Sequence, residues 1–245
     1  MVSGTKVVEA NPLARPRVAE PPGVGVQFRS MIALKAAMAI SGIVLFGFVL
    51  VHMLGNLKLY QGPAAMNSYG RALRELGTPL LGPGQALWMV RIVLLLAVAI
   101  HIWAAAVLTL NSRRARPQRY RILQPVQATY ASRTMRWGGV IVLLFVLFHL
   151  ADLTFGTVNP QFEDGLPYEN VVASFSRGWV SLFYVLANLA LGLHLYHGLW
   201  SLFQSLGWNH PWWNPWRRRF AAVFAVVITL GNVSFPVSVW MGWVP

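Results

Sequence analysis

The sequence of 245 residues contains no cysteine, and it has only seven Asp and Glu residues against twenty Lys and Arg. Without thiols, the chain cannot form disulfides, thiolate zinc sites, iron–sulfur ligation or a covalent c-type haem attachment. Charged residues make up only 11% of the chain, whereas soluble proteins average about a quarter. We therefore expect a chain that is not soluble, and in which any bound metal rests on histidine.

Apolar residues make up 56% of the chain and gather in five blocks. A block of about twenty apolar residues is long enough to cross a hydrocarbon core of about 30 Å as a helix. We therefore predict an all-α integral membrane protein whose five transmembrane helices form one up-and-down bundle. The predicted arm is 1–29, the predicted membrane domain is 30–245, and its spans are 31–56, 85–110, 135–155, 178–206 and 220–243.

The net charge of +13 comes from basic residues that lie almost entirely between the apolar blocks, which indicates membrane topology and no nucleic-acid partner. Fifteen Lys and Arg fall on one side, in the arm with the start of the first span and in segments 111–136 and 207–219. Four fall on the other side, in segments 57–84 and 156–177. Because basic loops stay in the cytoplasm, we predict a cytoplasmic amino terminus and an external carboxyl terminus.

Four of the five predicted spans carry a histidine near the middle of the membrane: His52, His101, His149 and His194. A polar ring at that depth costs free energy unless it has a partner, so each one is a candidate functional residue. With a rise of about 1.5 Å per residue from the cytoplasmic end, His101 and His194 lie at about 15 Å, His149 at about 21 Å and His52 at about 25 Å. We therefore predict an inner pair, His101 with His194, and an outer pair, His52 with His149.

The surroundings of the inner pair favour a flat ligand. Small residues lie one helical turn to either side of each ring: Ala97 and Ala105 beside His101, and Ala190 and Gly198 beside His194. Two imidazoles that face each other across a bundle can bind haem through both axial positions. Zinc prefers three or four protein ligands, so it fits less well. We predict a four-helix core that holds two b-type haems.

Two further histidines lie near the fourth span. His197 is three residues from His194 and could replace it as a ligand, but it lacks the small flanking residues. His210 lies among four tryptophans at the membrane interface, where we expect it to be solvated.

Haem propionates need cationic partners at the membrane edge. The candidates are Arg29, Lys35 and Arg136 on the inner side, and Arg91 on the outer side. Asp152, one turn beyond His149, could bond a ligand, pair with Arg91 or carry a proton.

Two runs of residues resemble a known family, the cytochrome b membrane-anchor subunit of bacterial succinate dehydrogenases. The runs are Ser30-x4-Lys35-x2-Met38-Ala39-x-Ser41-Gly42 with Val51-His52-Met53-x-Gly55-Asn56-Leu57, and His194-x3-Gly198-Leu199-Trp200 with Gln204 and Gly207. In the second and third spans the resemblance consists mainly of the histidine position. The architecture is similar to the single-subunit, five-helix, two-haem type of succinate:menaquinone reductases and fumarate reductases.

The resemblance implies that His52, His101, His149 and His194 are axial ligands, with His194 rather than His197 at the family position. It also implies a flavoprotein partner, an iron–sulfur partner, a membrane quinone as substrate and a location in the bacterial plasma membrane. Two quinone sites stay open: an inner one lined by Ser30, Lys35, Ser41 and Trp208, and an outer one lined by Glu75, Arg91 and Asp152. Glu75 and Asp152 are the candidates for quinone protonation.

The leading hypothesis is therefore a di-haem anchor that passes electrons from the iron–sulfur partner to quinone. One alternative is the cytochrome b anchor of another quinone-linked enzyme, such as a formate dehydrogenase or nitrate reductase. Those anchors place their ligands on fewer helices. The other alternative is a cofactor-free transporter or scaffold that uses buried histidines as polar pairs.

Overall fold

A computed structural model describes residues 31–114 and 130–244 of the chain. The helices are α1 (Met31–Asn56), the 3₁₀ helix η1 (Leu57–Gln61), α2 (Pro63–Arg74), α3 (Gln85–Arg114), α4 (Tyr130–Leu153), α5 (Pro167–Phe175), α6 (Gly178–Ser205) and α7 (Asn214–Trp240). No strand occurs within these described ranges. The predicted arm 1–29 lies outside them, and so do the site candidates Arg29 and Ser30.

Five of the described helices, α1, α3, α4, α6 and α7, are long and apolar enough to cross a membrane. In lipid, every backbone N–H and C=O must find its partner inside the protein, and a helix meets that need within a single segment. Large apolar side chains are exposed along these helices, for example Ile32 and Leu96. The prediction of an all-α membrane bundle with five spans is confirmed.

Three helices extend beyond the apolar blocks that predicted them. α7 begins at Asn214, before the predicted start at residue 220, and α4 begins at Tyr130, before the predicted start at residue 135. α3 continues to Arg114, past the predicted end at residue 110. Proline is present in the first turn of α7, where its fixed φ suits a helix and its missing N–H costs nothing. Apolar composition locates the part of a helix inside the membrane, so it misses turns that continue into the interface.

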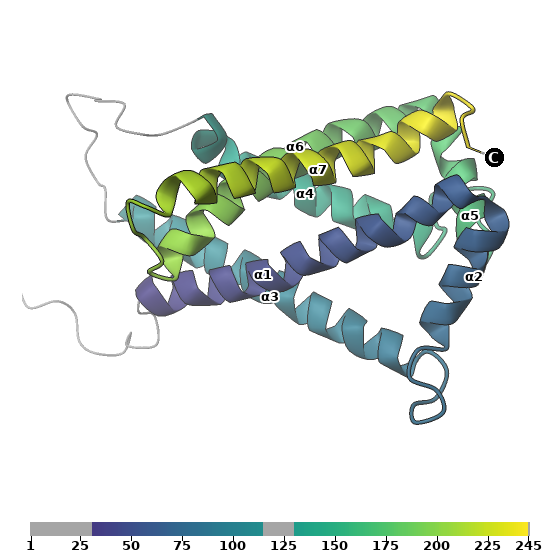
Figure 1. The fold of residues 1–245 in the computed structure, drawn as a ribbon, viewed down its shortest axis with the longest axis horizontal. Helices are drawn as coiled ribbons and strands as arrows, with labels where there is room; N and C mark the ends of the chain where they lie inside the picture. Colours follow the sequence, from purple (N-terminus) through teal and green to yellow (C-terminus); the bar gives the residue numbers. More distant parts are fainter. Residues whose placement is uncertain (1–30, 115–129, 245) are drawn as a thin grey trace, which may run out of the picture. The chain divides into compact units, whose positions relative to one another are not determined.

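The long helices pack in two sets. α6 lies alongside α7 and α4, while α1 packs on α3 and also contacts α6 and α7. Figure 1 shows α1 and α3 diverging towards α2, which runs between their ends.

α2 and α5 meet at one end of the bundle, which we call the α2/α5 end. There, the side-chain amide of Asn67 donates to the carboxylate of Glu169 at 2.9 Å, and its oxygen accepts from the backbone N–H of Tyr168 at 3.1 Å.

Candidate metal centres

The structure brings the four span histidines together as two pairs. The ring centroids of His52 and His149 are 5.8 Å apart, and those of His101 and His194 are 6.3 Å apart. Two imidazoles that share one metal ion at a metal–nitrogen distance of about 2 Å have centroids roughly 6 Å apart. The outer pair lies near the α2/α5 end, because His52 and His149 come close to the ends of α1 and α4 that lead there. Both pairs therefore have the spacing of a shared metal.

The second ring nitrogen of His101 is already engaged. Its Nδ1 lies 3.2 Å from the carbonyl oxygen of Met38 and 3.3 Å from the hydroxyl of Ser41. That hydroxyl donates its own proton to the carbonyl of Ala37 at 2.8 Å, so it can accept from the ring. Nδ1 thus carries the proton, and Nε2 keeps its lone pair. Metal-ligating histidines characteristically use their second nitrogen in this way.

Two glycines face the rings of the inner pair. A Cβ placed on Gly42 of α1 would lie 3.6 Å from Cε1 of His101, and one on Gly139 of α4 would lie 3.7 Å from Cε1 of His194. The predicted flanks are Ala97, which is buried, and Ala105, Ala190 and Gly198, which are half-buried. Small residues therefore lie beside both rings of the inner pair.

Gly139 was missed by the sequence reasoning. The signal for it was the Gly138–Gly139 pair, set among larger apolar residues in the third span.

His194 has a buried ring nitrogen, Nδ1, that lacks a hydrogen-bond partner in the described part of the chain. Buried polar atoms are normally paired, so an orphaned imidazole nitrogen points to an occupant or partner at this position. Within residues 31–114 and 130–244, no three His, Asp or Glu side chains gather as a metal-binding group. The inner pair offers two imidazoles, with small residues beside them and one unpaired nitrogen. This set suits a planar group that is bound by one imidazole on each face, whereas zinc needs at least three protein ligands.

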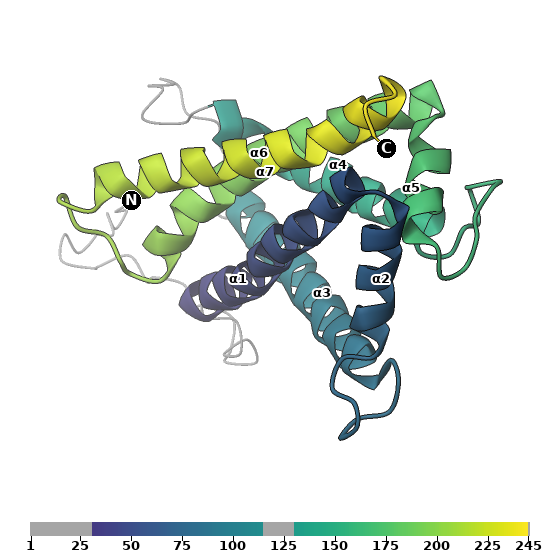
Figure 2. The same ribbon diagram turned by 45° about the vertical axis from the view of Figure 1, so that its right-hand side comes forward.

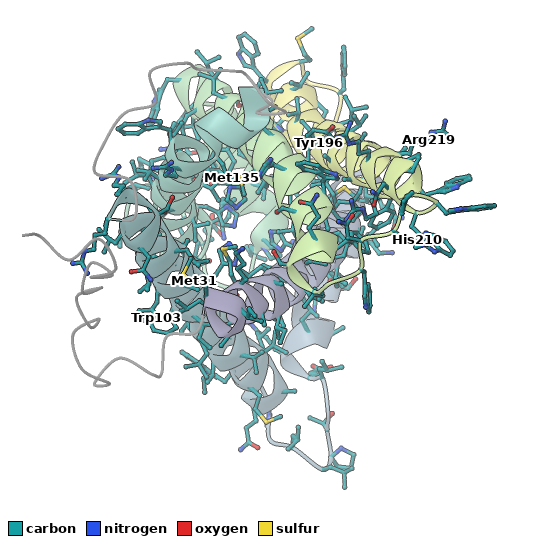
Figure 3. All side chains as sticks on the ribbon, turned by 90° about the vertical axis from the view of Figure 1, so that its left-hand side faces the viewer. Met31, Trp103, Met135, Tyr196, His210 and Arg219 are labelled. Atoms are coloured by element: carbon teal, nitrogen blue, oxygen red, sulfur yellow. The ribbon has the colours of Figure 1, made fainter. Side chains whose placement is uncertain are left out.

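His197 also has a buried Nδ1 without a partner in the described part of the chain, but its ring packs on Trp200, with centroids 5.8 Å apart. His210 is exposed and accepts from the backbone N–H of Trp212 at 3.3 Å. Figure 3 shows His210 projecting away from the helices, as Arg219 does.

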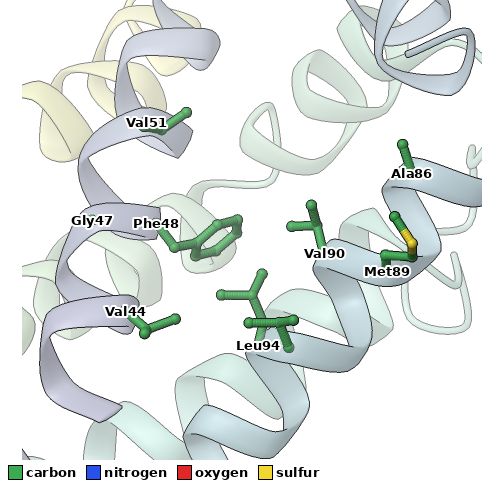
Figure 4. Close-up of a pocket in the computed structure, with 9 residues that line it drawn as sticks. Val44, Gly47, Phe48, Val51, Ala86, Met89, Val90 and Leu94 are labelled. Atoms are coloured by element: carbon green, nitrogen blue, oxygen red, sulfur yellow. The ribbon is translucent and has the colours of Figure 1, made fainter. Parts of the chain in front are cut away.

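Aromatic rings lie beside both histidines of the outer pair. Phe48 stacks on His52 with centroids 5.2 Å apart, and Phe145 lies 5.8 Å from His149. Phe48 also lines an apolar groove between α1 and α3, with a volume of about 490 Å³ (Figure 4). The other residues of this groove are Val44, Gly47, Val51, Ala86, Met89, Val90, Val93 and Leu94.

Asp152 does not pair with Arg91. It is fully buried and forms an ion pair with Arg177, whose Nη2 lies 2.7 Å from Oδ1. It also accepts hydrogen bonds from the hydroxyls of Ser174 and Tyr184. Arg91 is exposed, and its guanidinium lies over the ring of Trp88, 4.9 Å from the centroid. Helical spacing within the third span could not predict Arg177 as the partner of Asp152, because Arg177 is the N-cap residue of the next span, α6.

Four of the remaining candidates lie at the surface of the described part of the chain, and one is buried. Lys35, Arg136, Trp208 and Glu75 are exposed, whereas Ser41 is buried against His101.

Sequence reasoning also missed Arg217, which is 5% exposed and has an Nε without a partner among the described residues. Its run of three arginines indicated only topology. Nothing in the sequence marked Arg217 as different from Arg218 and Arg219, which are exposed.

Comparison with known proteins identifies the family. The family model described as succinate dehydrogenase/fumarate reductase transmembrane subunit matches residues 110–233, from the end of α3 to within α7. This stretch contains His149 and His194. No curated protein and no solved structure matches the chain. Because the match takes in half of the chain, the chain belongs to the succinate dehydrogenase/fumarate reductase transmembrane subunits and is a multi-pass membrane subunit of such an oxidoreductase complex.

Proposed function

We propose that the chain holds two b-type haems, one in each histidine pair, and passes electrons from an iron–sulfur partner subunit to membrane quinone. The observation that carries the proposal is the pairing itself: four rings on four spans, with centroids 5.8 and 6.3 Å apart within the pairs. A haem with imidazole on both faces has no open position for oxygen and exchanges single electrons.

The protein's own contribution is to position the ligands. Backbone and hydroxyl acceptors on α1 hold the proton of His101 on Nδ1, which leaves the lone pair of Nε2 available to a metal. Gly42 and Gly139 leave room beside these rings for a flat ligand. At the outer pair, Phe48 and Phe145 pack on the two rings and keep water away from them.

We place the quinone site at the outer pair. The apolar groove between α1 and α3 (Figure 4) includes exposed residues such as Val51 and Val93, so lipid can reach it. Phe48, which also lines the groove, stacks on His52. An isoprenoid chain suits such a lining, because all nine of its residues are apolar. Glu75 is the candidate proton donor, since it is exposed to water whereas Asp152 is locked in an ion pair. The competing location for the quinone is the inner side of the bundle, near Lys35, Ser41 and Trp208.

The soluble partners, a flavoprotein that oxidises succinate and an iron–sulfur protein, would dock at the opposite end of the bundle. We propose that this end is cytoplasmic, as the distribution of basic residues predicts. Exposed cations gather there at the ends of α3, α4 and α7: Arg113, Arg114, Arg136, Arg218 and Arg219.

A reduced-minus-oxidised absorption spectrum of the purified complex, combined with a haem assay, tests the proposal. We expect b-type bands and two haems for each copy of this subunit. A complex that is intact but shows no b-type bands would contradict the proposal and favour a cofactor-free anchor.

A further inference from the structure

A chain of buried hydrogen bonds joins His149 of the outer pair to a carboxylate. Nδ1 of His149 lies 3.3 Å from the hydroxyl oxygen of Tyr184, and that hydroxyl donates to Oδ2 of Asp152 at 2.9 Å. Because the hydroxyl proton goes to the carboxylate, the Tyr184 oxygen is free to accept the Nδ1–H of the ring. The network therefore selects the tautomer of His149 in which Nε2 has the lone pair.

Asp152 is fixed in place as an anion. It is 0% exposed, and Arg177 and Ser174 donate to its two oxygens at 2.7 and 2.5 Å. Arg177 is itself anchored, because it also donates to the carbonyl of Val158 at 2.8 Å. Hydrogen bonds to an ionised acceptor are stronger than neutral ones, so the carboxylate polarises the Tyr184 hydroxyl.

Tyr184 has little freedom to move. It is 3% exposed, and its ring centroid lies 4.7 Å from that of Phe175 and 5.1 Å from that of Phe145. A rotamer locked by packing presents its hydroxyl at one place, which is what a supporting residue of a ligand site needs.

We infer that Tyr184, with Asp152 behind it, is a positioning residue that sets the ring orientation, tautomer and electron density of His149 as a metal ligand. The inference rests on the proposed function, because it requires haem in the outer pair. Partners of this kind raise the basicity of a ligating imidazole, and an electron-rich ligand favours the oxidised metal. Among the described residues, the corresponding nitrogen of His101 faces a backbone carbonyl and a serine hydroxyl, and no carboxylate of this part of the chain bonds to it.

The test is Tyr184→Phe in the complete complex, followed by a potentiometric titration of the haem absorption bands. This change keeps the ring that packs on Phe175 and removes the oxygen that faces His149. We expect the midpoint potential of the outer haem to rise while that of the inner haem stays unchanged. The outer haem is identified as the one that His194→Ala retains.

Ser174→Ala is the matched control, because it removes another donor to the same Asp152 oxygen but does not touch His149. It must not raise the midpoint potential of the outer haem, because Asp152 keeps its charge and Tyr184 keeps its hydroxyl, and it should leave that of the inner haem unchanged. Equal shifts in Tyr184→Phe and Ser174→Ala would mean that the network has only a structural role, and an unchanged potential in Tyr184→Phe would also overturn the inference.

If Tyr184→Phe does not assemble, Asp152→Asn decides the question. It removes the charge but keeps an oxygen that can accept from Tyr184, and it must raise the same potential by a smaller amount. If the complex without substitutions contains two haems and neither variant shifts a midpoint potential, the role of Tyr184 is refuted while the proposed function stands. An unchanged complex without haem would overturn the proposed function as well.

Discussion

At the scale of single residues, the depth of the imidazoles in their spans predicted which rings lie near each other, whereas their role as metal ligands stays a prediction. His101 and His194 were placed at equal depth by helix rise, and their rings lie side by side in the structure. Residues that meet these rings from other helices could not be predicted in this way. Gly139 and Tyr184 belong to α4 and α6, and only tertiary packing shows that they face His194 and His149.

His194 and His197 give the first prediction at this scale. His194→Ala removes a ring of the inner pair, so it should lose one haem of the two and leave the outer one. His197 packs on Trp200 instead, so His197→Ala should retain both haems. Haem content and difference spectra of the two variants check this. Loss of haem from His197→Ala alone would show that the ligand assignment on α6 is wrong.

The second prediction at this scale concerns Gly139. A leucine there fills the space beside His194, so Gly139→Leu should lose the inner haem while the subunit still assembles. Gly138→Leu is the control, because a Cβ on Gly138 meets nothing within 4 Å. Both changes replace glycine by a better helix former, so helix propensity favours the two variants equally. The comparison is made by haem stoichiometry, and equal haem content in the two variants would refute a slot beside Gly139.

At the scale of elements, apolar blocks predicted the spans well because lipid forces such blocks into helices. Their ends were predicted less well, as α7 shows by starting at Asn214. The joint between α4, α5 and α6 was not predicted at all. Asp152 of α4 binds Ser174 of α5 and Arg177 at the start of α6, and three residues from separate segments give no periodic signal in the sequence.

We expect the ion pair of Asp152 with Arg177 to stabilise the contact between α4, α5 and α6. Asp152→Ala leaves Arg177 without its partner in a largely buried site, and we expect a loss of about 3 kcal/mol in the free energy of unfolding. The ion pair of Arg74 with Asp164 is the comparison, since its side chains are 51% and 91% exposed. Arg74→Ala should change the free energy by less than about 1 kcal/mol. Denaturant unfolding in detergent measures both, and similar losses would contradict a special role for Asp152.

At the scale of the whole molecule, composition established the class of protein. The scarcity of acidic residues and the five apolar blocks predicted a membrane bundle, and the structure has five helices of membrane length in the part of the chain that it describes. Orientation rests on the basic residues alone, and several of these, such as Arg116 and Arg119, lie outside the described residues.

The absence of cysteine allows orientation to be tested by labelling, because any introduced thiol is the only one in the chain. Ser68 on α2 and Asn209 after α6 are both exposed and lie at opposite ends of the bundle. We expect an impermeant thiol reagent to label Ser68→Cys in intact cells, and Asn209→Cys only after permeabilisation. The reverse pattern would invert the topology and move the proposed partner surface to the other side.

The central claim is that the two histidines of each pair bind the same iron. The most direct measurement is the position of iron in crystals of the complete complex, located by its anomalous scattering. We predict two iron positions in this subunit, one between His101 and His194 and one between His52 and His149. Iron found elsewhere in the subunit, or none between these rings, would contradict the account.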